Sequence, residues 1–548
     1  MSRAASAPAP VLLQVDGAPQ TEWDLEVDVV VVGFGAAGAV AAIEAHDAGA
    51  EVLLLEKTPH PGGLSIVSAG GIRIAFDEAA AFSYLKATCG GRTPDAHLQV
   101  LAQGMVAAPE RMRAYARASD ATVKVTPALG NYPLPGYEAL GYCEVVEVPG
   151  IEGATHVHGV RGVRPGSRLF KVLEDNVIQR GIPVHLDAPA ERLLRRQDAG
   201  VEGVRARIAG RMVNIRARGG VVLACGGFEA NEDMKAQYFQ ASPVLVGSFL
   251  GNTGDGIAMA QEAGAALWHM WHYHGPYGLR HPDPEFPYGL YLKAVPMWTP
   301  GRADALSDLG VVDAMGRPQP AKALPQVAWI LCDRTGRRFM DEYPPYPGDF
   351  GVRPLDQYDS KTQSFPRIPA FILFDEAGRG MYPLGRCAIN GAQEHWYAWS
   401  ADNAKEVELG FFERAETLED LAALMQVPAD VLRKTVEDWN AACDAGIDAA
   451  FGRRAETMVP LRAPPFYVGR VWPMVINTQG GPVHDVRQRV LNPYGEPIAG
   501  LYAAGELGSV FGHLYMSGGN LAECVVGGAI AGREAALRPA MAREAAHG

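Results

Sequence analysis

A glycine-rich turn between two apolar segments near the start of the chain limits the possible fold more than any other feature. Residues 27–32 are a run of valines broken by one aspartate, and Gly-Phe-Gly-Ala-Ala-Gly follows at 33–38. An alanine-rich stretch to about Ala48 and a second apolar run, Val52–Leu55, complete the pattern. This order predicts a βαβ unit with two buried parallel strands.

The spacing of the three glycines is typical of a turn that binds the pyrophosphate of a dinucleotide. Gly33 allows the tight turn, Gly35 lets the backbone approach the pyrophosphate, and Gly38 lets the helix pack closely on the sheet. The helix dipole then faces the phosphates with its positive end. Glu56, at the end of the second strand, can accept hydrogen bonds from a ribose diol. The whole unit predicts a dinucleotide site, and the alternative is that the glycines serve close packing alone.

Length and composition narrow the class of protein. A chain of 548 residues exceeds what one hydrophobic core usually serves, so at least two domains are expected. Lys and Arg number 49 against 62 Asp and Glu, and without a basic cluster this balance argues against nucleic acid as a partner. No apolar run reaches transmembrane length and the N-terminus lacks a signal-peptide core, which predicts a cytoplasmic protein. The seven cysteines occur singly, with no CxxC, which predicts free thiols and no metal site.

Further motifs follow the βαβ unit in a fixed order. They are a Gly- and Ser-rich segment at 57–71, Gly-Gly-Phe-Glu-Ala-Asn at 226–231, Asn-Thr-Gly-Asp-Gly at 252–256, Arg-Thr-Gly-Arg-Arg-Phe-Met-Asp-Glu at 334–342 and Leu-Tyr-Ala-Ala-Gly-Glu at 501–506. The glycines and hydroxyls of the segment 57–71 can lie along a long flat ring. An NAD enzyme does not need such a second binding segment in addition to the glycine-rich turn. With these motifs the chain resembles the flavoprotein family of FAD-dependent fumarate reductases and 3-ketosteroid dehydrogenases.

The resemblance implies an α/β fold: a Rossmann-like FAD-binding domain with a parallel sheet and an inserted α+β cap domain. We expect a loose leader at 1–24, an FAD-binding domain from 25–280 and 466–548, and a cap at 281–465, with the substrate held between domains. Relatives with covalent FAD carry a histidine just before the Gly-Gly pair, and none occurs at 64–71, so noncovalent FAD is expected. The predicted cofactor-binding residues are Gly33, Gly35, Ala36, Ala37, Gly38, Glu56, Lys57, Gly62, Gly63, Ser65, Gly70, Gly71, Ala224, Gly226, Asn252, Asp255, Gly505, Glu506, Gly519, Asn520 and Leu521.

The resemblance also indicates which chemistry to expect. The arginines and histidine with which fumarate reductases hold two carboxylates and relay a proton are replaced by Met516, by 476–477 and by 343–346. Tyr515 and Gly519 instead match the Tyr-x-x-x-Gly with which 3-ketosteroid dehydrogenases grip a ketone oxygen. Tyr346 lies where these enzymes carry a cap tyrosine. Ser517 forms the pattern Tyr-x-Ser with Tyr515, which resembles more closely the branch of the family that desaturates the bond between C4 and C5.

These residues predict an FAD-dependent oxidoreductase acting on CH–CH groups. Tyr515 and the Gly519 amide would polarise the ketone, and Tyr346, helped by Ser517 or another tyrosine, would remove the α-proton while the β-hydride moves to flavin N5. The predicted substrate is a hydrophobic cyclic ketone, a 3-ketosteroid in particular, with a quinone, small electron carrier or oxygen as external acceptor. One alternative is an ene reductase, because Arg379 lies about where fumarate reductases carry their catalytic acid. The other alternative is a non-catalytic flavoprotein.

Three further segments have open roles. The aromatic stretch 267–277 contains His269, His272 and His274, and we interpret it as an apolar wall beside the flavin or as core packing. Residues 393–451 predict amphipathic helices that build the cap. The third segment contains tyrosines that could supply a third phenol from the FAD-binding domain, and these are Tyr132, Tyr137 and Tyr142.

Overall fold

A computed structural model describes residues 22–196, 200–293, 311–312, 318–319, 326–344, 346–387 and 395–547. Residues 1–21 of the predicted leader lie outside this range. The last residues of the leader are attached to the fold, because the Asp24 amide donates to the Asn214 carbonyl at 2.9 Å.

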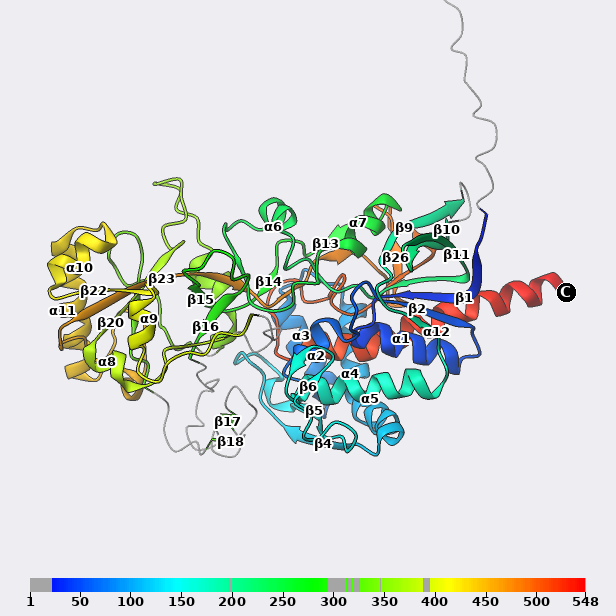
Figure 1. The fold of residues 1–548 in the computed structure, drawn as a ribbon, viewed down its shortest axis with the longest axis horizontal. Helices are drawn as coiled ribbons and strands as arrows, with labels where there is room; N and C mark the ends of the chain where they lie inside the picture. Colours follow the sequence, from blue (N-terminus) through cyan, green and yellow to red (C-terminus); the bar gives the residue numbers. More distant parts are fainter. Residues whose placement is uncertain are drawn as a thin grey trace, which may run out of the picture.

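The predicted βαβ unit forms the centre of an eight-stranded sheet (Figure 1). Strand β1 (Leu25–Val32) lies between β2 (Val52–Leu55) and β11 (Arg211–Leu223) and runs parallel to both. The path is β26-β27-β11-β1-β2-β8, and β10 and β9 extend it as an antiparallel pair from β11. The remaining strands are β8 (Val184–His185), β9 (Ala190–Arg196), β10 (Gly200–Ile208), β26 (Arg489–Leu491) and β27 (Pro497–Ala503). The predicted α/β class with a parallel Rossmann-like sheet is confirmed.

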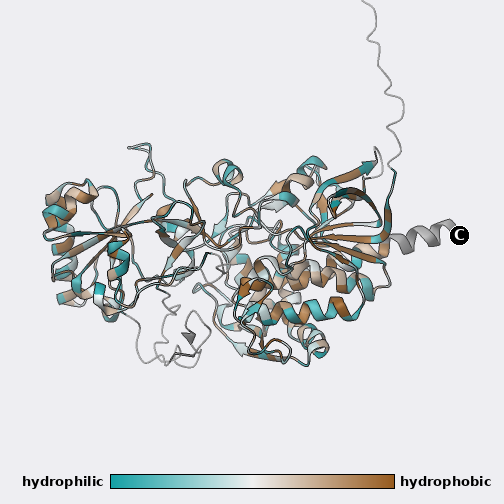
Figure 2. Ribbon diagram, viewed as in Figure 1, coloured by the Kyte–Doolittle hydropathy of each residue, from teal (hydrophilic) through white to brown (hydrophobic). Residues whose placement is uncertain are grey.

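Successive side chains of β1 point into two different cores, as a strand buried on both faces requires. Val29 and Val31 pack with the helices on one face, whereas Val30 and Val32 pack on the other face. The first face carries the helices seen below the sheet in Figure 1, and Figure 2 shows the strands between the two layers as mostly apolar. The helices of the first face are α1 (Ala36–Asp47), α2 (Gly63–Val67), α3 (Glu78–Cys89), α4 (Asp95–Ala116), α5 (Pro165–Gln179) and α12 (Gly519–His547). Helices α6 (Glu232–Tyr238) and α7 (Asp255–Glu262) pack with the second core.

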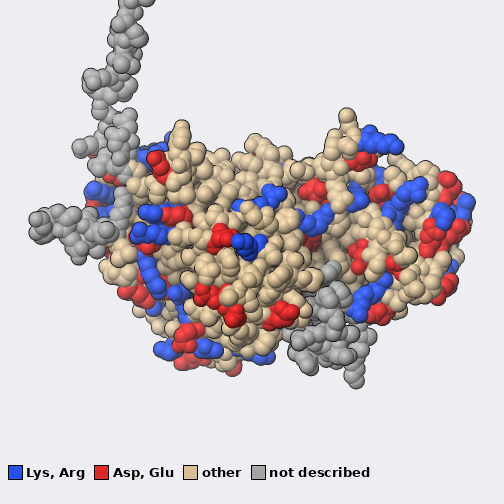
Figure 3. Space-filling model, turned by 180° about the vertical axis from the view of Figure 1, so that it is seen from behind, with Lys and Arg blue, Asp and Glu red and all other residues tan. Residues whose placement is uncertain are grey.

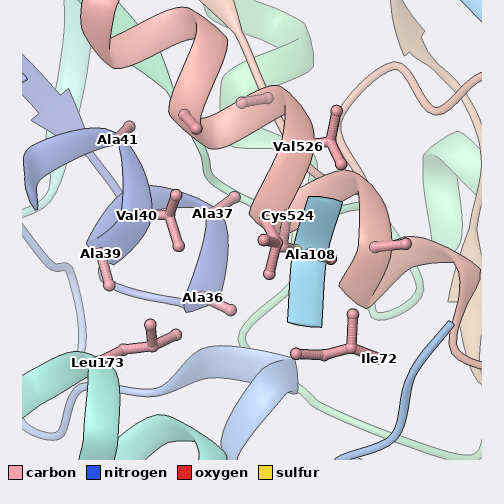
Figure 4. Packing of buried hydrophobic residues seen from close by; sticks show 14 of the residues in the cluster. Ala36, Ala37, Ala39, Val40, Ala41, Ile72, Ala108, Leu173, Cys524 and Val526 are labelled. Carbon is pink, nitrogen blue, oxygen red and sulfur yellow. The ribbon is translucent and has the colours of Figure 1, made fainter. Parts of the chain in front are cut away.

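Helix α12, at the C-terminal end of the chain, packs directly on α1 through small residues. A side-chain carbon added at Gly528 would lie 2.7 Å from the Ala37 carbonyl oxygen, and one at Gly532 would lie 2.2 Å from that of Ala41. Figure 4 shows residues of α1 beside Cys524 of α12. The start of α12 is therefore held close to the start of α1.

A second, antiparallel sheet forms the other half of the molecule, at the left of Figure 1. Its order is β19-β20-β23-β15-β16-β21, with β12 and β22 also paired to β23. The strands are β12 (Leu245–Val246), β15 (Tyr277–Arg280), β16 (Gly289–Leu292), β19 (Ile330–Cys332), β20 (Ala370–Asp375), β21 (Gly385–Arg386), β22 (Phe412–Ala415) and β23 (Phe466–Val475). The predicted domain division at 280/281 and 465/466 stays a prediction. Strands β15 and β23, on the FAD-binding side of those limits, belong to this second sheet.

The outer part of the second sheet is covered by short helices. They are α8 (Glu376–Met381), α9 (Ala404–Glu408), α10 (Leu418–Met425) and α11 (Ala429–Ala445). Three of them fall in the segment where helices were predicted, although β22 interrupts that segment, and residues 393–394 lie outside the described part. A small three-stranded sheet of β3 (Ile72–Ala75), β4 (Thr122–Pro127) and β5 (Leu140–Glu147) packs against the helices of the first domain. Short pairs are formed by β6 (His156–Val157), β7 (Val160–Arg161), β13 (Leu267–Trp268), β14 (Tyr273–His274), β17 (Val311–Val312), β18 (Pro318–Gln319), β24 (Asn477–Thr478) and β25 (Gly481–Pro482).

Charged side chains of both signs alternate over the face drawn in Figure 3. Within the part of the chain that the structure describes, no helix is both long enough and apolar enough to cross a bilayer.

Gly532→Ala is expected to destabilise the fold by about 1–3 kcal/mol, because the added methyl group would overpack the contact between α1 and α12. Gly380→Ala is the matched control, since a carbon added there meets nothing within 4 Å. Urea unfolding of both variants measures the difference. Equal midpoints would contradict the close contact.

Candidate functional site

A cleft of about 770 Å³, open to solvent, lies where the parallel strands of the first sheet end. Val32 of β1, Leu55 of β2 and Ala224, which follows β11, line it. Since β2 and β11 lie on opposite sides of β1, this edge is the point where the strand order reverses. A crevice at such a point is where open α/β sheets bind their ligands.

The start of α1 opens into this cleft, and its geometry fits a pyrophosphate. The N-cap of this helix is Gly35, which has no side chain, and the Ser65 hydroxyl accepts from the Ala36 amide at 3.1 Å. A side-chain carbon at Gly35 would meet the Ser65 hydroxyl at 3.6 Å and the Gly62 carbonyl oxygen at 3.8 Å, both ordinary contacts, so the backbone is approachable there. Gly33 and Gly38 are needed for close packing of the backbone. A side-chain carbon at Gly33 would lie 2.5 Å from the Ala224 carbonyl oxygen, and one at Gly38 would lie 1.9 Å from the Gly33 carbonyl oxygen. These residues fit FAD, with the glycines placing the helix amides toward its phosphates.

Glu56 and Lys57 lie in the cleft with partners of their own. The Glu56 carboxylate accepts from the amides of Phe34 and Thr58 and from the Thr58 hydroxyl, each at 2.9 Å. A carboxylate has about four acceptor sites, so acceptor capacity remains for a ribose. The Lys57 ammonium donates to Asp255 at 2.6 Å, so these two predicted cofactor residues neutralise each other's charge.

The structure brings most, not all, of the predicted cofactor residues to the cleft. Those that line it are Gly33, Gly35, Ala36, Ala37, Glu56, Lys57, Gly63, Ser65, Ala224, Gly226, Asn252, Asp255 and Glu506. Those not in its lining are Gly38, Gly62, Gly70, Gly71, Gly505, Gly519, Asn520 and Leu521. The lining also includes residues that no sequence motif indicated, and these are Ala188, Ala190, Phe249, Gly251, Met259 and Cys524.

Two buried carboxyl groups meet beside the cleft, a feature that sequence reasoning missed. A side-chain carbon at Gly227 would lie 2.6 Å from Glu506 Oε1 and 2.8 Å from Glu229 Oε2, so both groups reach the same point. The Asn252 amide lies 3.1 Å from Glu229 and 3.5 Å from Glu506. Burial raises the pKa of both carboxyls, and for Glu506 the charge of Glu229 raises the pKa further. The pair therefore shares a proton at neutral pH.

A buried cluster of phenols and one histidine lies at the start of α12. The Tyr346 hydroxyl is 2.8 Å from His274 Nε2, and the two rings stack 5.4 Å apart. The Tyr515 ring lies 4.4 Å from the same imidazole. Burial raises the pKa of both phenols and lowers the pKa of His274, so all three groups are neutral. A neutral imidazole can accept a proton from the phenol when its Nε2 atom carries the lone pair.

The predicted residues at the start of α12 lie in this cluster, with one difference. The Gly519 amide donates to the Met516 carbonyl at 2.8 Å, and the amide that faces the Tyr515 hydroxyl, at 3.4 Å, is that of Asn520. Polarisation of a ketone by Gly519 would therefore require exchange of an existing hydrogen bond. Ser517 hydrogen-bonds Tyr346 through its side chain, which opposes the upward shift of the Tyr346 pKa.

A third phenol comes from the FAD-binding half of the chain. The Tyr132 ring meets the Tyr346 ring edge-on at 5.7 Å, and its hydroxyl donates to Asp349 at 2.8 Å. Arg353 donates to the same carboxylate at 3.2 Å and also to the His513 carbonyl. Of the three tyrosines proposed for this place, Tyr132 is the one whose ring contacts Tyr346 directly.

Two cap residues that the family motifs emphasised are structural. Glu342 is buried and accepts from Arg338 at 2.9 Å and from Arg453 at 3.0 Å, and these cations lower its pKa against the effect of burial. Arg379 pairs with Glu376 at 2.6 Å on α8, at the far end of the cap (Figure 1). The suggestion that Arg379 takes the place of an active-site acid is therefore wrong, because it is engaged away from the phenol cluster.

The aromatic stretch 267–277 is more polar than an apolar wall. His269 and His272 contact the carbonyls of Ser509 and Phe511 at 2.8 and 2.6 Å, which fixes the loop before α12. His274 is the missed residue of the phenol cluster, and its pairing with Tyr346 had no signal in the sequence. Among the described residues, no group of three His, Cys, Asp or Glu side chains could hold a metal ion.

Comparison with known proteins identifies this arrangement. A model of the FAD binding domain family matches residues 28–284 and 307–521. The chain belongs to this FAD-binding family. It is 28% identical to a 3-oxosteroid 1-dehydrogenase of Mycobacterium tuberculosis, over 89% of this chain and 94% of that protein. It is 26% identical to a cytochrome-type fumarate reductase of Shewanella frigidimarina, over 93% and 77% of the two chains.

A solved structure gives the same assignment. The 3-ketosteroid Δ1-dehydrogenase of Sterolibacterium denitrificans, in complex with 1,4-androstadiene-3,17-dione, superposes with a TM-score of 0.74 at 25% identity and covers 93% of this chain and 99% of that one. The protein is thus an FAD-dependent oxidoreductase of the group that contains 3-ketosteroid dehydrogenases and fumarate reductases and acts on CH–CH bonds. The family resemblance inferred from the motifs is confirmed.

The shared proton of Glu229 and Glu506 should make stability depend on pH. Their folded-state pKa values lie above the ordinary 4.5, so the folded protein binds more protons than the unfolded chain, and the free energy of unfolding falls as pH rises above about 5. Glu506→Gln should remove about one proton from this dependence, roughly 1.4 kcal/mol per pH unit. Chemical unfolding from pH 5 to 7 measures it, with the exposed Glu408→Gln as control. Parallel curves for wild type and Glu506→Gln would refute proton sharing.

Proposed function

We propose that the protein is an FAD-dependent dehydrogenase that introduces a C=C bond α,β to the ketone of a hydrophobic cyclic substrate, a 3-ketosteroid in particular. The observation that carries this proposal is the contact of the Tyr346 hydroxyl with His274, with the Tyr515 ring against the same imidazole. The activity of the relatives, 3-oxosteroid 1-dehydrogenation, supports it.

In the proposed reaction, the two phenols have different roles: one polarises the carbonyl group and the other removes the α-proton. The Tyr515 hydroxyl donates to the carbonyl oxygen and acidifies the neighbouring C–H bond. The Tyr346 oxygen takes the α-proton while its own hydroxyl proton passes to His274 Nε2, at 2.8 Å. Ser517 and Tyr132 surround Tyr346 and would hold its oxygen in place. The bound flavin supplies the two-electron acceptor for the hydride that leaves the β-carbon.

The alternative is reduction of an unsaturated carbonyl compound, as the similarity to a fumarate reductase allows. The residues of the cluster favour a neutral ketone over a dicarboxylate. Arg353 is already engaged by Asp349 and by the His513 carbonyl. A dicarboxylate bound there without a paired cation for each charge would be unfavourable, because the site is buried.

We also propose that FAD is bound noncovalently and that a quinone, a small electron carrier or oxygen reoxidises it. No histidine occurs in the sequence from Leu64 to Gly71, next to the cradle. Acid precipitation should therefore release all of the flavin into the supernatant. Flavin retained on the pellet would overturn this part of the proposal.

Anaerobic addition of a saturated 3-ketosteroid to the holoenzyme should bleach the flavin absorbance. Tyr515→Phe should slow bleaching by about 10²–10³-fold, because it removes one donor to the developing oxyanion. Tyr346→Phe should slow it by about 10²–10⁴-fold, because it removes the proton acceptor. Stopped-flow absorbance measures both rates.

Tyr494→Phe is the matched control, because Tyr494 is 88% exposed and lies outside the cluster. An unchanged bleaching rate in Tyr515→Phe would refute carbonyl polarisation by this residue. Turnover of an unsaturated ketone with reduced dye, without bleaching by any saturated ketone, would favour the reductase instead.

A further inference from the structure

The histidine beside Tyr346 ends a chain of buried side-chain amides that leads to the Glu523 carboxylate of α12. His274 Nδ1 lies 2.9 Å from Asn477 Oδ1, and the Asn477 amide nitrogen donates to Asn520 Oδ1. The Asn520 amide nitrogen in turn donates to Glu523 at 2.7 Å. All four side chains are at least nine-tenths buried, so no bulk water competes for these bonds.

The direction of this chain is set at its carboxylate end. Glu523 accepts from the Val510 amide at 2.7 Å, and an amide N–H can only donate. It also accepts from the Ser509 hydroxyl at 2.9 Å. Burial raises the pKa of Glu523 to about 7, so above that pH the group is ionised and can only accept.

An acceptor-only end leaves one orientation for each amide. Asn520 must turn its nitrogen to Glu523 and its oxygen to Asn477, which must then turn its nitrogen to Asn520 and its oxygen to His274. The proton of the neutral imidazole consequently lies on Nδ1, and the free lone pair on Nε2 faces the Tyr346 hydroxyl. The opposite tautomer would place the Nδ1 lone pair against the Asn477 Oδ1 atom, which is two acceptors with no proton between them.

We propose that Glu523 is a positioning residue that, through Asn520 and Asn477, fixes the Nδ1–H tautomer of His274 and so gives Tyr346 its proton acceptor. This inference rests on the proposed function for its catalytic meaning, whereas the tautomer itself can be observed without turnover. It assigns a role to a carboxylate that lies three side chains away from the phenol.

The test is the ¹⁵N NMR spectrum of the holoenzyme with labelled histidine at pH 8.5, in which the His274 signals are assigned by their loss in His274→Gln. Wild type should show a protonated Nδ1 and an unprotonated Nε2. Glu523→Gln should populate the Nε2–H tautomer, because a glutamine can turn its nitrogen to Asn520, and should slow flavin bleaching about 10-fold. Glu406→Gln, which replaces a buried carboxylate of the cap, should change neither measurement.

A double variant distinguishes an effect of hydrogen-bond direction from an effect of side-chain packing. In Glu523→Gln/Asn520→Asp the acceptor-only group moves one link along the chain, so Asn477 regains its orientation and the Nδ1–H tautomer should return. A purely structural role for Glu523 predicts no such rescue. A wild-type spectrum with Nε2 protonated, or a Glu523→Gln spectrum equal to wild type, would overturn the inference. Because the wild-type spectrum decides by itself, the inference stays testable if Glu523→Gln fails to fold.

The outcomes for the two proposals can be told apart. If the tautomers behave as expected but saturated ketosteroids never bleach the flavin, the proposed function fails and the role of Glu523 stands. If bleaching occurs and depends on Tyr515 while His274 holds its proton on Nε2, the inference fails and the proposed function stands.

Discussion

The close contact of α1 with α12 is the constraint on which the rest of the site depends. Gly528 and Gly532 let α12 lie against the carbonyl oxygens of α1, because any side chain there would separate the helices. The start of α1 faces the cleft, and the start of α12 carries Asn520 and Glu523. Two helix ends from opposite ends of the chain are thus fixed side by side, which joins the nucleotide cleft to the phenol cluster. Loosening this contact would change both at once.

The second constraint is that several polar groups of the site are buried and shielded from bulk water. Glu229, Glu506, Glu523 and His274 are all at least nine-tenths buried, which shifts each pKa toward the neutral form. An unpaired polar group in such surroundings costs several times the free energy of a typical hydrogen bond, so each amide has one favourable orientation. Under the proposed function, the neutral phenols and the neutral imidazole would suit a neutral ketone better than a charged substrate.

The cap is attached to the nucleotide half through the same segments that build the site. Strand β23 spans the centre of the second sheet and leads into β24, whose Asn477 contacts His274 and whose Thr478 amide donates to Glu506 at 2.8 Å. Tyr346 enters from the cap near the buried Glu342 ion pairs, which fix the preceding segment. Any shift of the cap would move Tyr346 relative to His274. The distance between the Tyr346 hydroxyl and His274 is thus tied to how the two halves meet.

The sequence alone determined the βαβ unit, the family and the places of Tyr515, Tyr346 and Ser517, because these depend on local periodicity and on motifs that are short in sequence. It could not indicate His274, Glu229 or Glu523 as members of a site. His274 and Asn477 are 203 positions apart, and Asn252 and Glu506 are 254 apart, so only the folded chain brings them within hydrogen-bonding distance. The Gly519 amide shows the same limit, since its bond to Met516 depends on the turn that precedes α12. Residue types are written in the sequence, whereas the direction of a hydrogen bond between distant side chains is decided by packing.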